Sequence, residues 1–263
     1  MLHRRVIGLA LAVVLCASAT GCARRGEREL AVGMELAYPP FEMSDEQGRP
    51  AGVSVDLAHA LGTFLGKPVH IQNIAFDGLI PSLKTGKIDL IISSMTATPE
   101  RAQSIDFSEP YLTTGLALLA GAKSDIQSIA DLHRSGKVVA VKKGTTGHLY
   151  AVEHLPSANI LVLDKENACV IEVAQRKADA FIYDQMSVLK NWEQHPQETR
   201  ALLAPFKMEQ WAIGIRKGND ALREKVNTFL RDFRSEDGFE KLGERWLGEQ
   251  KRAFATRGIP FVF

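Results

Sequence analysis

Residues 86–101, GKIDLIISSMTATPER, predict a buried strand followed closely by a helix. Ile88–Ser93 is an apolar, β-branched run, which is typical of a strand covered on both faces. Thr98 can cap a helix, and Pro99 would then occupy the first helical position, where its missing N–H costs nothing. A strand that leads through a short loop into a helix is the building unit of α/β folds.

Strands and helices alternate on both sides of this stretch. Further strands are expected at Leu30–Leu36, Val69–Ile74, Val138–Val141, Ile160–Leu163, Ala180–Tyr183 and Trp211–Arg216. Helices are expected from Ser54 and from Asp77, which can cap them, and at His148–Leu155, Asn167–Lys177, Gln185–Glu193, Ala221–Phe233 and Gly238–Trp246. This alternation predicts an α/β fold with mostly parallel sheets, and such sheets bind ligands in the loops that follow the carboxyl ends of their strands.

The composition is that of an ordinary globular protein. The 263 residues are 45% hydrophobic and 24% charged, which excludes a disordered, collagen-like or coiled-coil chain. A formal net charge of +1 argues against general binding to nucleic acid or to a membrane surface. Of the three cysteines, Cys16 and Cys22 lie in or beside a targeting segment and Cys169 lies within an expected helix, so no structural disulfide is predicted.

The first residues are predicted to be a targeting segment. The basic start His3-Arg4-Arg5 precedes the apolar run Val6–Ala19, which is short for a membrane span but suits a signal-peptide core. The run ends in Ala19-Thr20-Gly21-Cys22, which resembles a bacterial lipobox; plain secretion is the alternative. We therefore expect residues 1–22 to be signal peptide and lipobox and residues 23–29 to be a polar tether. Lipidation of Cys22 would then hold the protein to a bacterial membrane on its extracytoplasmic side.

Short motifs in a fixed order carry a family resemblance. They are YPPFE at 38–42, FDGLIPSL at 76–83, GKIDLIIS at 86–93, TATPER at 96–101, IDFSEPY at 105–111 and GTT at 144–146. Together they resemble the polar amino-acid family of bacterial extracytoplasmic solute-binding proteins, which supply ABC importers. The resemblance runs from about Leu30 to Gly248. It implies a free L-amino acid as ligand, an ABC permease as partner, no cofactor and no enzymatic activity.

The same resemblance implies two α/β lobes with the ligand between them. Each lobe would be a mostly parallel sheet flanked by helices, and two crossing strands near Tyr111–Gly115 and Lys207–Trp211 would form the hinge. Lobe 1 would comprise residues 30–112 and 210–250, and lobe 2 residues 113–209. The tail, residues 251–263, lies beyond the family pattern, and it is expected either to pack on lobe 1 or to mediate self-association. A monomer is expected.

Arg101 is the predicted anchor for the ligand's carboxylate. A guanidinium binds a carboxylate through two parallel hydrogen bonds, and the first turn of a helix also favours an anion. The family uses the arginine of this motif in that way. Ser94 and Thr96 follow the buried strand and can offer a hydroxyl and a carbonyl. Thr146, in the Gly-Thr-Thr turn, would complete the carboxylate site from lobe 2.

The remaining site residues concern the ammonium and the side chain of the ligand. Asp184 follows an expected strand, where the family uses an acid to pair the α-ammonium, and it can also cap the next helix. Tyr38 and Phe76 resemble the two aromatic walls that enclose the ligand side chain in the family. Phe41 is assigned to the core.

Glu35 and Lys142 are expected to set the specificity. An acid at the position of Glu35 is typical of family members that bind basic amino acids, whereas a lysine at the position of Lys142 is typical of glutamine binders. A Glu35–Lys142 pair would offer one acceptor and one donor, which matches a neutral carboxamide. Glutamine is therefore the leading ligand, and arginine, lysine or histidine is the alternative.

Motifs for other functions are missing from the sequence. It has no H-E-x-x-H, no G-x-S-x-G and no P-loop, so no metal, hydrolase or nucleotide site is predicted. A dehydratase built on the same fold is the enzyme alternative. It would need a general acid aimed into the cleft, for which Glu35 or Asp184 is available.

Overall fold

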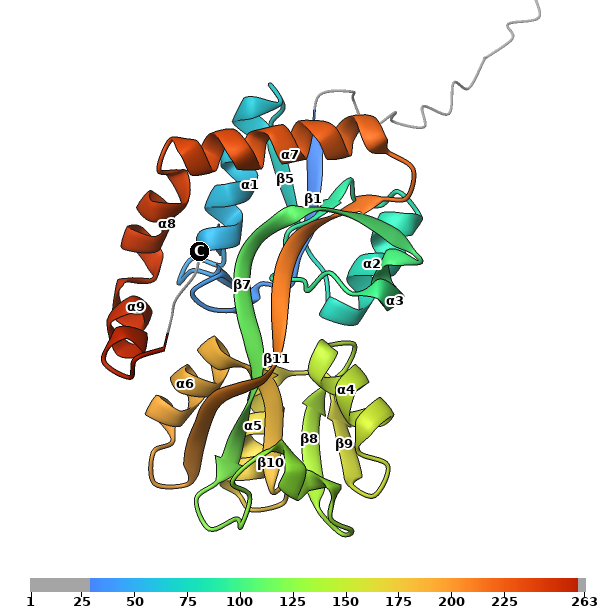
Figure 1. The fold of residues 1–263 in the computed structure, drawn as a ribbon. Helices are drawn as coiled ribbons and strands as arrows, with labels where there is room; N and C mark the ends of the chain where they lie inside the picture. The colour runs from blue at the N-terminus through green and yellow to red at the C-terminus, as the bar shows by residue number, and fades with distance from the viewer. Residues whose placement is uncertain (1–28, 260–263) are drawn as a thin grey trace, which may run out of the picture.

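The computed structural model describes residues 29–259, and two long strands pass from the upper half of the molecule into the lower half (Figure 1). Strand β7 (Ile105–Gly121) and strand β11 (Thr199–Arg216) pair antiparallel at the centre of an eight-stranded sheet. The strand order is β5-β1-β6-β11-β7-β10-β8-β9, so everything on one side of this pair forms an upper lobe and everything on the other a lower lobe. The crossing segments predicted at 111–115 and 207–211 face each other in this pair.

The upper lobe contains the parallel strands at one end of the sheet, covered by helices. Its strands are β1 (Leu30–Met34), β5 (Val69–Asn73) and β6 (Leu90–Ile91), and β1 pairs in parallel with both others. Its helices are α1 (Val53–Phe64), α2 (Phe76–Lys84), α3 (Pro99–Ala102), α7 (Asp220–Ser235) and α8 (Gly238–Trp246). A small antiparallel sheet, β2 (Ala37–Tyr38), β3 (Glu42–Ser44) and β4 (Pro50–Ala51), follows β1.

The lower lobe repeats this arrangement. Strand β8 (Val138–Lys142) lies in parallel between β9 (Asn159–Leu163) and β10 (Ala180–Asp184). The helical segments are η1 (Ile129–His133), α4 (Thr146–His154), α5 (Glu166–Ala174) and α6 (Gln185–Gln194). The predicted two-lobed α/β fold is confirmed, with parallel pairing inside each lobe and antiparallel pairing along the shared central strands.

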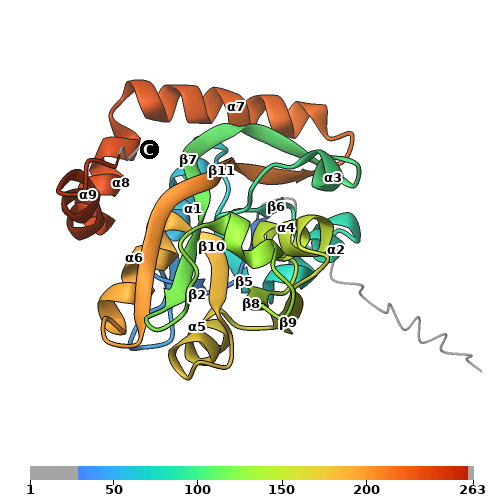
Figure 2. The same cartoon turned by 60° about the horizontal axis from the view of Figure 1, so that its bottom comes forward.

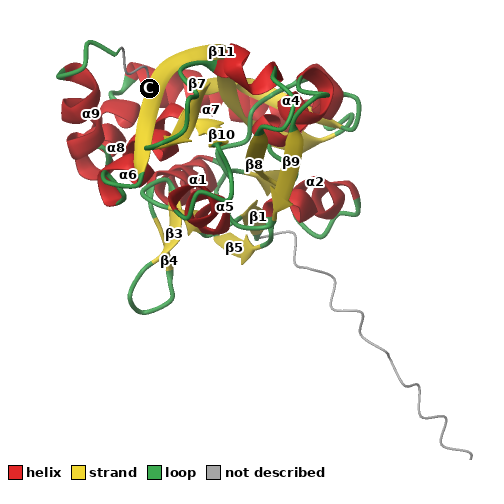
Figure 3. Cartoon of the chain, turned by 90° about the horizontal axis from the view of Figure 1, so that it is seen from below, coloured by secondary structure: helices red, strands yellow, loops and turns green. Residues whose placement is uncertain are grey.

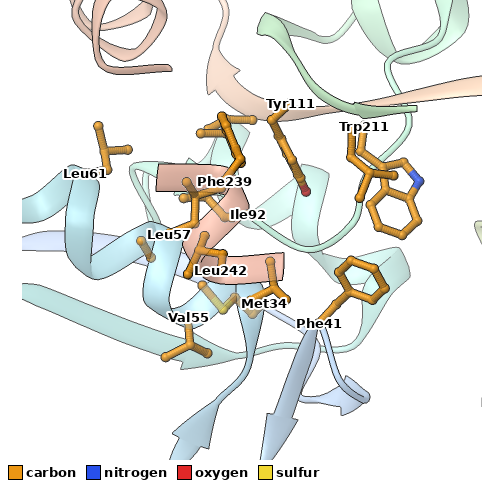
Figure 4. Close-up of a cluster of buried hydrophobic side chains, with 14 of the residues drawn as sticks. Met34, Phe41, Val55, Leu57, Leu61, Ile92, Tyr111, Trp211, Phe239 and Leu242 are labelled. Carbon is orange, nitrogen blue, oxygen red and sulfur yellow. The ribbon is translucent and has the colours of Figure 1, made fainter. Parts of the chain in front are cut away.

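The core of the upper lobe extends down to the hinge. Met34, Phe41, Leu57 and Trp211 are all buried in one cluster, in which Phe41 and Trp211 lie edge to face with their ring centroids 5.0 Å apart. Figure 4 shows Phe41 and Trp211 together at one side of this cluster. The assignment of Phe41 to the core is confirmed. Cys169 is buried in a separate cluster of the lower lobe, as expected for an apolar filler.

Two predicted helix caps are wrong. Helix α1 begins at Val53 with Gly52 as its cap, and the Ser54 hydroxyl instead donates a 2.6 Å hydrogen bond to the buried Glu42 carboxylate. Helix α2 begins at Phe76, so Asp77 lies in its first turn and pairs with Lys143 of the lower lobe at 2.9 Å. In both cases a partner distant in sequence takes the side chain that a local pattern assigns to the helix end.

The C-terminal segment connects the two lobes. After α8 the chain forms helix α9 (Gly248–Ala255), which was not predicted and lies beside α6 of the lower lobe (Figures 2 and 3). Phe254 is buried, and Arg257 lies 3.7 Å from Glu193 and over the ring of Trp192, both on α6. The described part of the tail therefore packs on lobe 2 as well as on lobe 1. Within residues 29–259, no helix has both the length and the apolarity needed to cross a bilayer.

Candidate functional site

All the ligand-binding residues proposed from the sequence line one small cavity between the lobes. Its volume is about 40 Å³. The proposed residues that line it are Glu35, Tyr38, Phe76, Ser94, Thr96, Arg101, Lys142, Thr146 and Asp184. They come from the segments that follow β1, β5 and β6 in the upper lobe, and from the ends of β8 and β10 and the start of α4 in the lower lobe. The carboxyl ends of parallel strands meet at one edge, so these segments converge at the cleft. Cys22 lies outside the described residues.

Arg101 is a buried cation in this cavity. Its backbone N–H donates to the Thr98 hydroxyl, which confirms the predicted helix start, and the residue is only 7% exposed. Nη1 donates to the Thr96 carbonyl at 2.7 Å, and Nη2 donates to the Gly144 carbonyl of the lower lobe at 3.0 Å. Burial lowers the pKa of Arg101 to about 10, which leaves it charged at neutral pH.

A carboxylate that sequence reasoning missed lies beside Arg101. Glu209, on β11, is 5% exposed, and its Oε2 accepts hydrogen bonds from the hydroxyls of Thr96 at 3.1 Å and Thr146 at 3.0 Å. Burial raises the pKa of Glu209, and the nearby Arg101 and Lys207 oppose that shift. The sequence offered one indication of this role: Glu209 lies in the second predicted crossing segment, and a strand that connects the two lobes has to run along the base of the cleft between them.

Asp184 has the local role predicted for it and a contact across the lobes. Its Oδ1 accepts from the backbone N–H groups of Met186 and Ser187, so it caps α6. The same oxygen accepts a 2.6 Å hydrogen bond from the Tyr38 hydroxyl of the upper lobe. Burial raises the pKa of Asp184 to about 7, against the effect of the Tyr38 hydrogen bond.

Glu35 and Lys142 form an ion pair across the cleft. Lys142 is the last residue of β8 and is only 2% exposed, and its Nζ lies 5.6 Å from the centroid of the Phe76 ring. The side chain of Lys142 therefore points into the cavity. The pair therefore places a hydrogen-bond acceptor, the Glu35 carboxylate, and a donor, the Lys142 ammonium, in the lining of the cavity together with Phe76.

A further buried carboxyl, Glu42, also lines this cavity. It is the last residue of the YPPFE motif, and it accepts hydrogen bonds from the hydroxyls of Ser54, Ser94 and Ser93. Burial raises the pKa of Glu42 to about 8, although the serine hydroxyls lower it. The Ser94 hydroxyl is therefore directed to Glu42, and the Thr96 carbonyl is occupied by Arg101.

The aromatic wall around Tyr38 is larger than the sequence indicated. The Tyr38 ring stacks on Phe41 with centroids 5.4 Å apart, and it meets Trp211 and Tyr183 edge to face at 6.0 Å. Trp211 and Tyr183 also line the cavity, and neither was proposed from the sequence. Phe76 lies near Arg101 instead, with the guanidinium carbon 5.4 Å from its ring centroid.

Comparison with known proteins assigns the chain to a family. The family model of bacterial extracellular solute-binding proteins, family 3, matches residues 30–249, so this chain belongs to that family. One relative is the L-cystine-binding protein TcyJ of Escherichia coli strain K12, 27% identical over 221 residues that cover 83% of this chain and 82% of that protein.

Solved structures support the same assignment. An ancestral arginine-binding protein is 34% identical and covers 84% of this chain and 98% of its own; it is described bound to arginine, with a TM-score of 0.78, and bound to glutamine, with a TM-score of 0.77. The ancestral amino acid-binding protein AncCDT-1, a precursor of cyclohexadienyl dehydratase, is also 34% identical, with a TM-score of 0.76 over 83% of this chain and 94% of its own. The predicted family is therefore confirmed, and its relatives bind amino acids.

Proposed function

We propose that this protein captures a free polar L-amino acid by closure of its two lobes and delivers it to an ABC permease. The observation that carries this proposal is Arg101, a buried cation that lines the interlobe cavity beside hydroxyls of both lobes, Thr96 and Thr146. A ligand held by partners on both lobes stabilises the closed arrangement relative to the open one. Micromolar affinity needs about 8 kcal/mol net, which a carboxylate, an ammonium and aromatic contacts can supply together.

The two ends of an amino-acid backbone match two parts of the cavity. Arg101 with Thr96 and Thr146 offers charge and hydroxyl donors to the α-carboxylate, as the family does. Asp184, on the lower lobe, is the partner for the α-ammonium. An ammonium beside Asp184 favours its ionised form and offsets the effect of burial on its pKa. The ligand side chain then extends along Tyr38 and Phe76.

Glutamine is the side chain that the Glu35–Lys142 pair favours. A carboxamide can donate its N–H to Glu35 and accept from Lys142 with its oxygen, so neither charge of the pair loses a partner. A cationic side chain would meet Lys142, and two like charges 4 Å apart repel by about 4 kcal/mol at an effective dielectric of 20.

A basic amino acid is the second candidate, favoured by the charges around the cavity. The acids Glu35, Glu42, Asp184 and Glu209 face the bases Arg101 and Lys142. A cationic ligand would reduce this excess of negative charge. Protonation reduces it as well, because the pKa values of Glu42 and Asp184 are raised to about 8 and about 7. Glutamine therefore stays the leading proposal.

The location proposed is extracytoplasmic, with Cys22 lipidated and the folded body held at a bacterial membrane as a monomer. The chain is proposed to act without enzymatic activity, in keeping with the absence of catalytic sequence motifs. The dehydratase alternative would require Glu35 or Asp184 to act as a general acid, and both are engaged in contacts across the lobes.

Calorimetric titration tests the proposal. The body from Glu27 to Phe263 is unfolded and refolded to remove carried-over ligand, then titrated with glutamine and with arginine. Binding of glutamine with arginine silent is the expected result. Binding of arginine alone would assign Glu35 to recognition of a cation. Binding of neither, nor of any other free amino acid, would overturn the proposal and favour the enzyme alternative.

A further inference from the structure

We propose that Glu209 shares the hydroxyl donors of Thr96 and Thr146 with the ligand's carboxylate, and that ligand binding therefore transfers one proton from solvent to Glu209. This inference rests on the proposed function, because it requires a carboxylate ligand at Arg101. It assigns to the hinge strand β11 a residue that couples binding to pH.

The geometry places the carboxyl of Glu209 where the ligand's carboxylate is expected. Glu209 Oε2 accepts from the Thr96 hydroxyl of the upper lobe and from the Thr146 hydroxyl of the lower lobe. The sequence assigns these same threonines to the ligand. Within the described residues, Glu209 Oε1 is buried and has no hydrogen-bond partner. One carboxyl oxygen is thus held by both lobes, and the other is left without a partner.

Two carboxylates cannot use these donors at once. Each threonine hydroxyl carries a single proton and donates to one acceptor at a time. Arg101 carries a single positive charge, and two of its five N–H groups already donate to carbonyls, so it cannot fully neutralise both anions. When two carboxylates occupy one buried site, one of them takes up a proton. The proton binds an oxygen of Glu209, and the resulting O–H donates to the ligand's carboxylate.

The charged groups around Glu209 act on its protonation in both directions, and the ligand's carboxylate adds to those that favour it. Arg101 from α3 and Lys207 on β11 both favour the anion of Glu209. Asp184 at the end of β10 is a like charge that interacts with it. Burial already raises the pKa of Glu209, and the arriving carboxylate adds a second negative charge. The ligand keeps its own charge because the carboxyl pKa of a free amino acid is far lower.

Proton counting by calorimetry tests this inference. The refolded chain and its Glu209→Gln variant are titrated with glutamine and with arginine, in phosphate and in Tris at several pH values from 6 to 9. The difference in apparent heat between the buffers gives the protons taken up. Glu42 and Asp184 titrate in both proteins, so the quantity of interest is the difference between the two. Glu100→Gln, an exposed acid next to Arg101, is the matched control.

At pH values above the pKa of Glu209 in the ligand-free protein, the wild-type chain is expected to take up more protons on binding than Glu209→Gln does. The expected difference is close to one proton per ligand bound. The association constant of the wild type should then fall about tenfold more per pH unit than that of the variant, which binds at least as tightly at pH 8. Equal proton counts, with binding intact, would overturn the inference alone. A 100-fold or greater loss of affinity in Glu209→Gln would overturn the inference, because it would show that the Glu209 carboxylate pairs with the ligand's α-ammonium. No binding of any amino acid to the wild type would overturn the proposed function with it.

Discussion

The Arg101 guanidinium of the upper lobe donates a 3.0 Å hydrogen bond to the Gly144 carbonyl of the lower lobe, while its other terminal nitrogen holds the Thr96 carbonyl. The residue that is proposed to bind the ligand's carboxylate is therefore also a contact that joins the closed lobes. Because both roles need the fork of the guanidinium, charge alone at this position is insufficient.

We expect Arg101→Ala to abolish binding of every amino acid, with a loss of at least about 100-fold, since hydrogen bonds to charged groups contribute about 1.5–3 kcal/mol each. Arg101→Lys should bind more weakly than the wild type by tenfold or more, because a lysine offers a point charge without the fork. Calorimetric titration measures both. Arg49→Ala removes an exposed arginine paired with Asp45 and serves as the control. Normal binding by Arg101→Ala would refute the carboxylate assignment.

Lys142→Leu is expected to change the preference of the site without abolishing binding. Removal of the ammonium leaves Glu35 without its partner across the cleft, so glutamine should bind roughly tenfold more weakly and arginine more tightly. The ratio of the two dissociation constants is the measurement. Lys143→Leu, at the exposed rim beside Asp77, is the matched control and should leave the ratio unchanged. An unchanged ratio in Lys142→Leu would remove this residue from specificity.

Stability should fall with rising pH because of Glu42. The pKa of Glu42 is about 8 in the folded protein and near 4.5 when unfolded, so the folded state holds more protons between these values. Its contribution to the free energy of unfolding is therefore lost as pH rises from about 4.5 through about 8, by up to about 1.4 kcal/mol per pH unit.

Urea unfolding at pH 5 and pH 8 tests this expectation. Glu42→Gln should reduce the difference in the free energy of unfolding between the two pH values. Glu46→Gln, an exposed acid that follows the same small sheet strand, should show the full wild-type difference. A Glu42→Gln variant with the wild-type pH dependence would show that Glu42 titrates normally.

Removal of the C-terminal segment should weaken closure. A chain that ends at Leu247 lacks Phe254 and the contacts of Arg257 with Glu193 and Trp192 on α6. We expect a several-fold higher dissociation constant, faster release of the ligand and a larger radius of gyration by small-angle scattering. Circular dichroism should show that the two lobes are still folded. Unchanged release kinetics would mean that α9 contributes to stability alone.

The sequence was sufficient for the parts of this protein that local patterns encode. Alternation of strands and helices indicated the α/β class, and the nine ligand-binding residues proposed with the help of the family resemblance all line one cavity. Thr98 and Asp184 cap the helices predicted for them, because a cap needs only the next few residues. Ser54 and Asp77 do not, because each contacts a residue from another part of the fold.

What only the tertiary structure decided depends on contacts between residues far apart in the chain. Glu209 reaches Thr96 and Thr146 because the register of β11 against β7 turns its side chain toward the cleft. The pattern of polar and apolar residues along β11 does not by itself specify that register. Glu42 is a buried acid because three serine hydroxyls converge on it, two of them from the segment after β6. Residue type and local spacing determined which groups are available at the cleft. Long-range strand pairing and burial decided which of them meet, and therefore which carboxyls have raised pKa values.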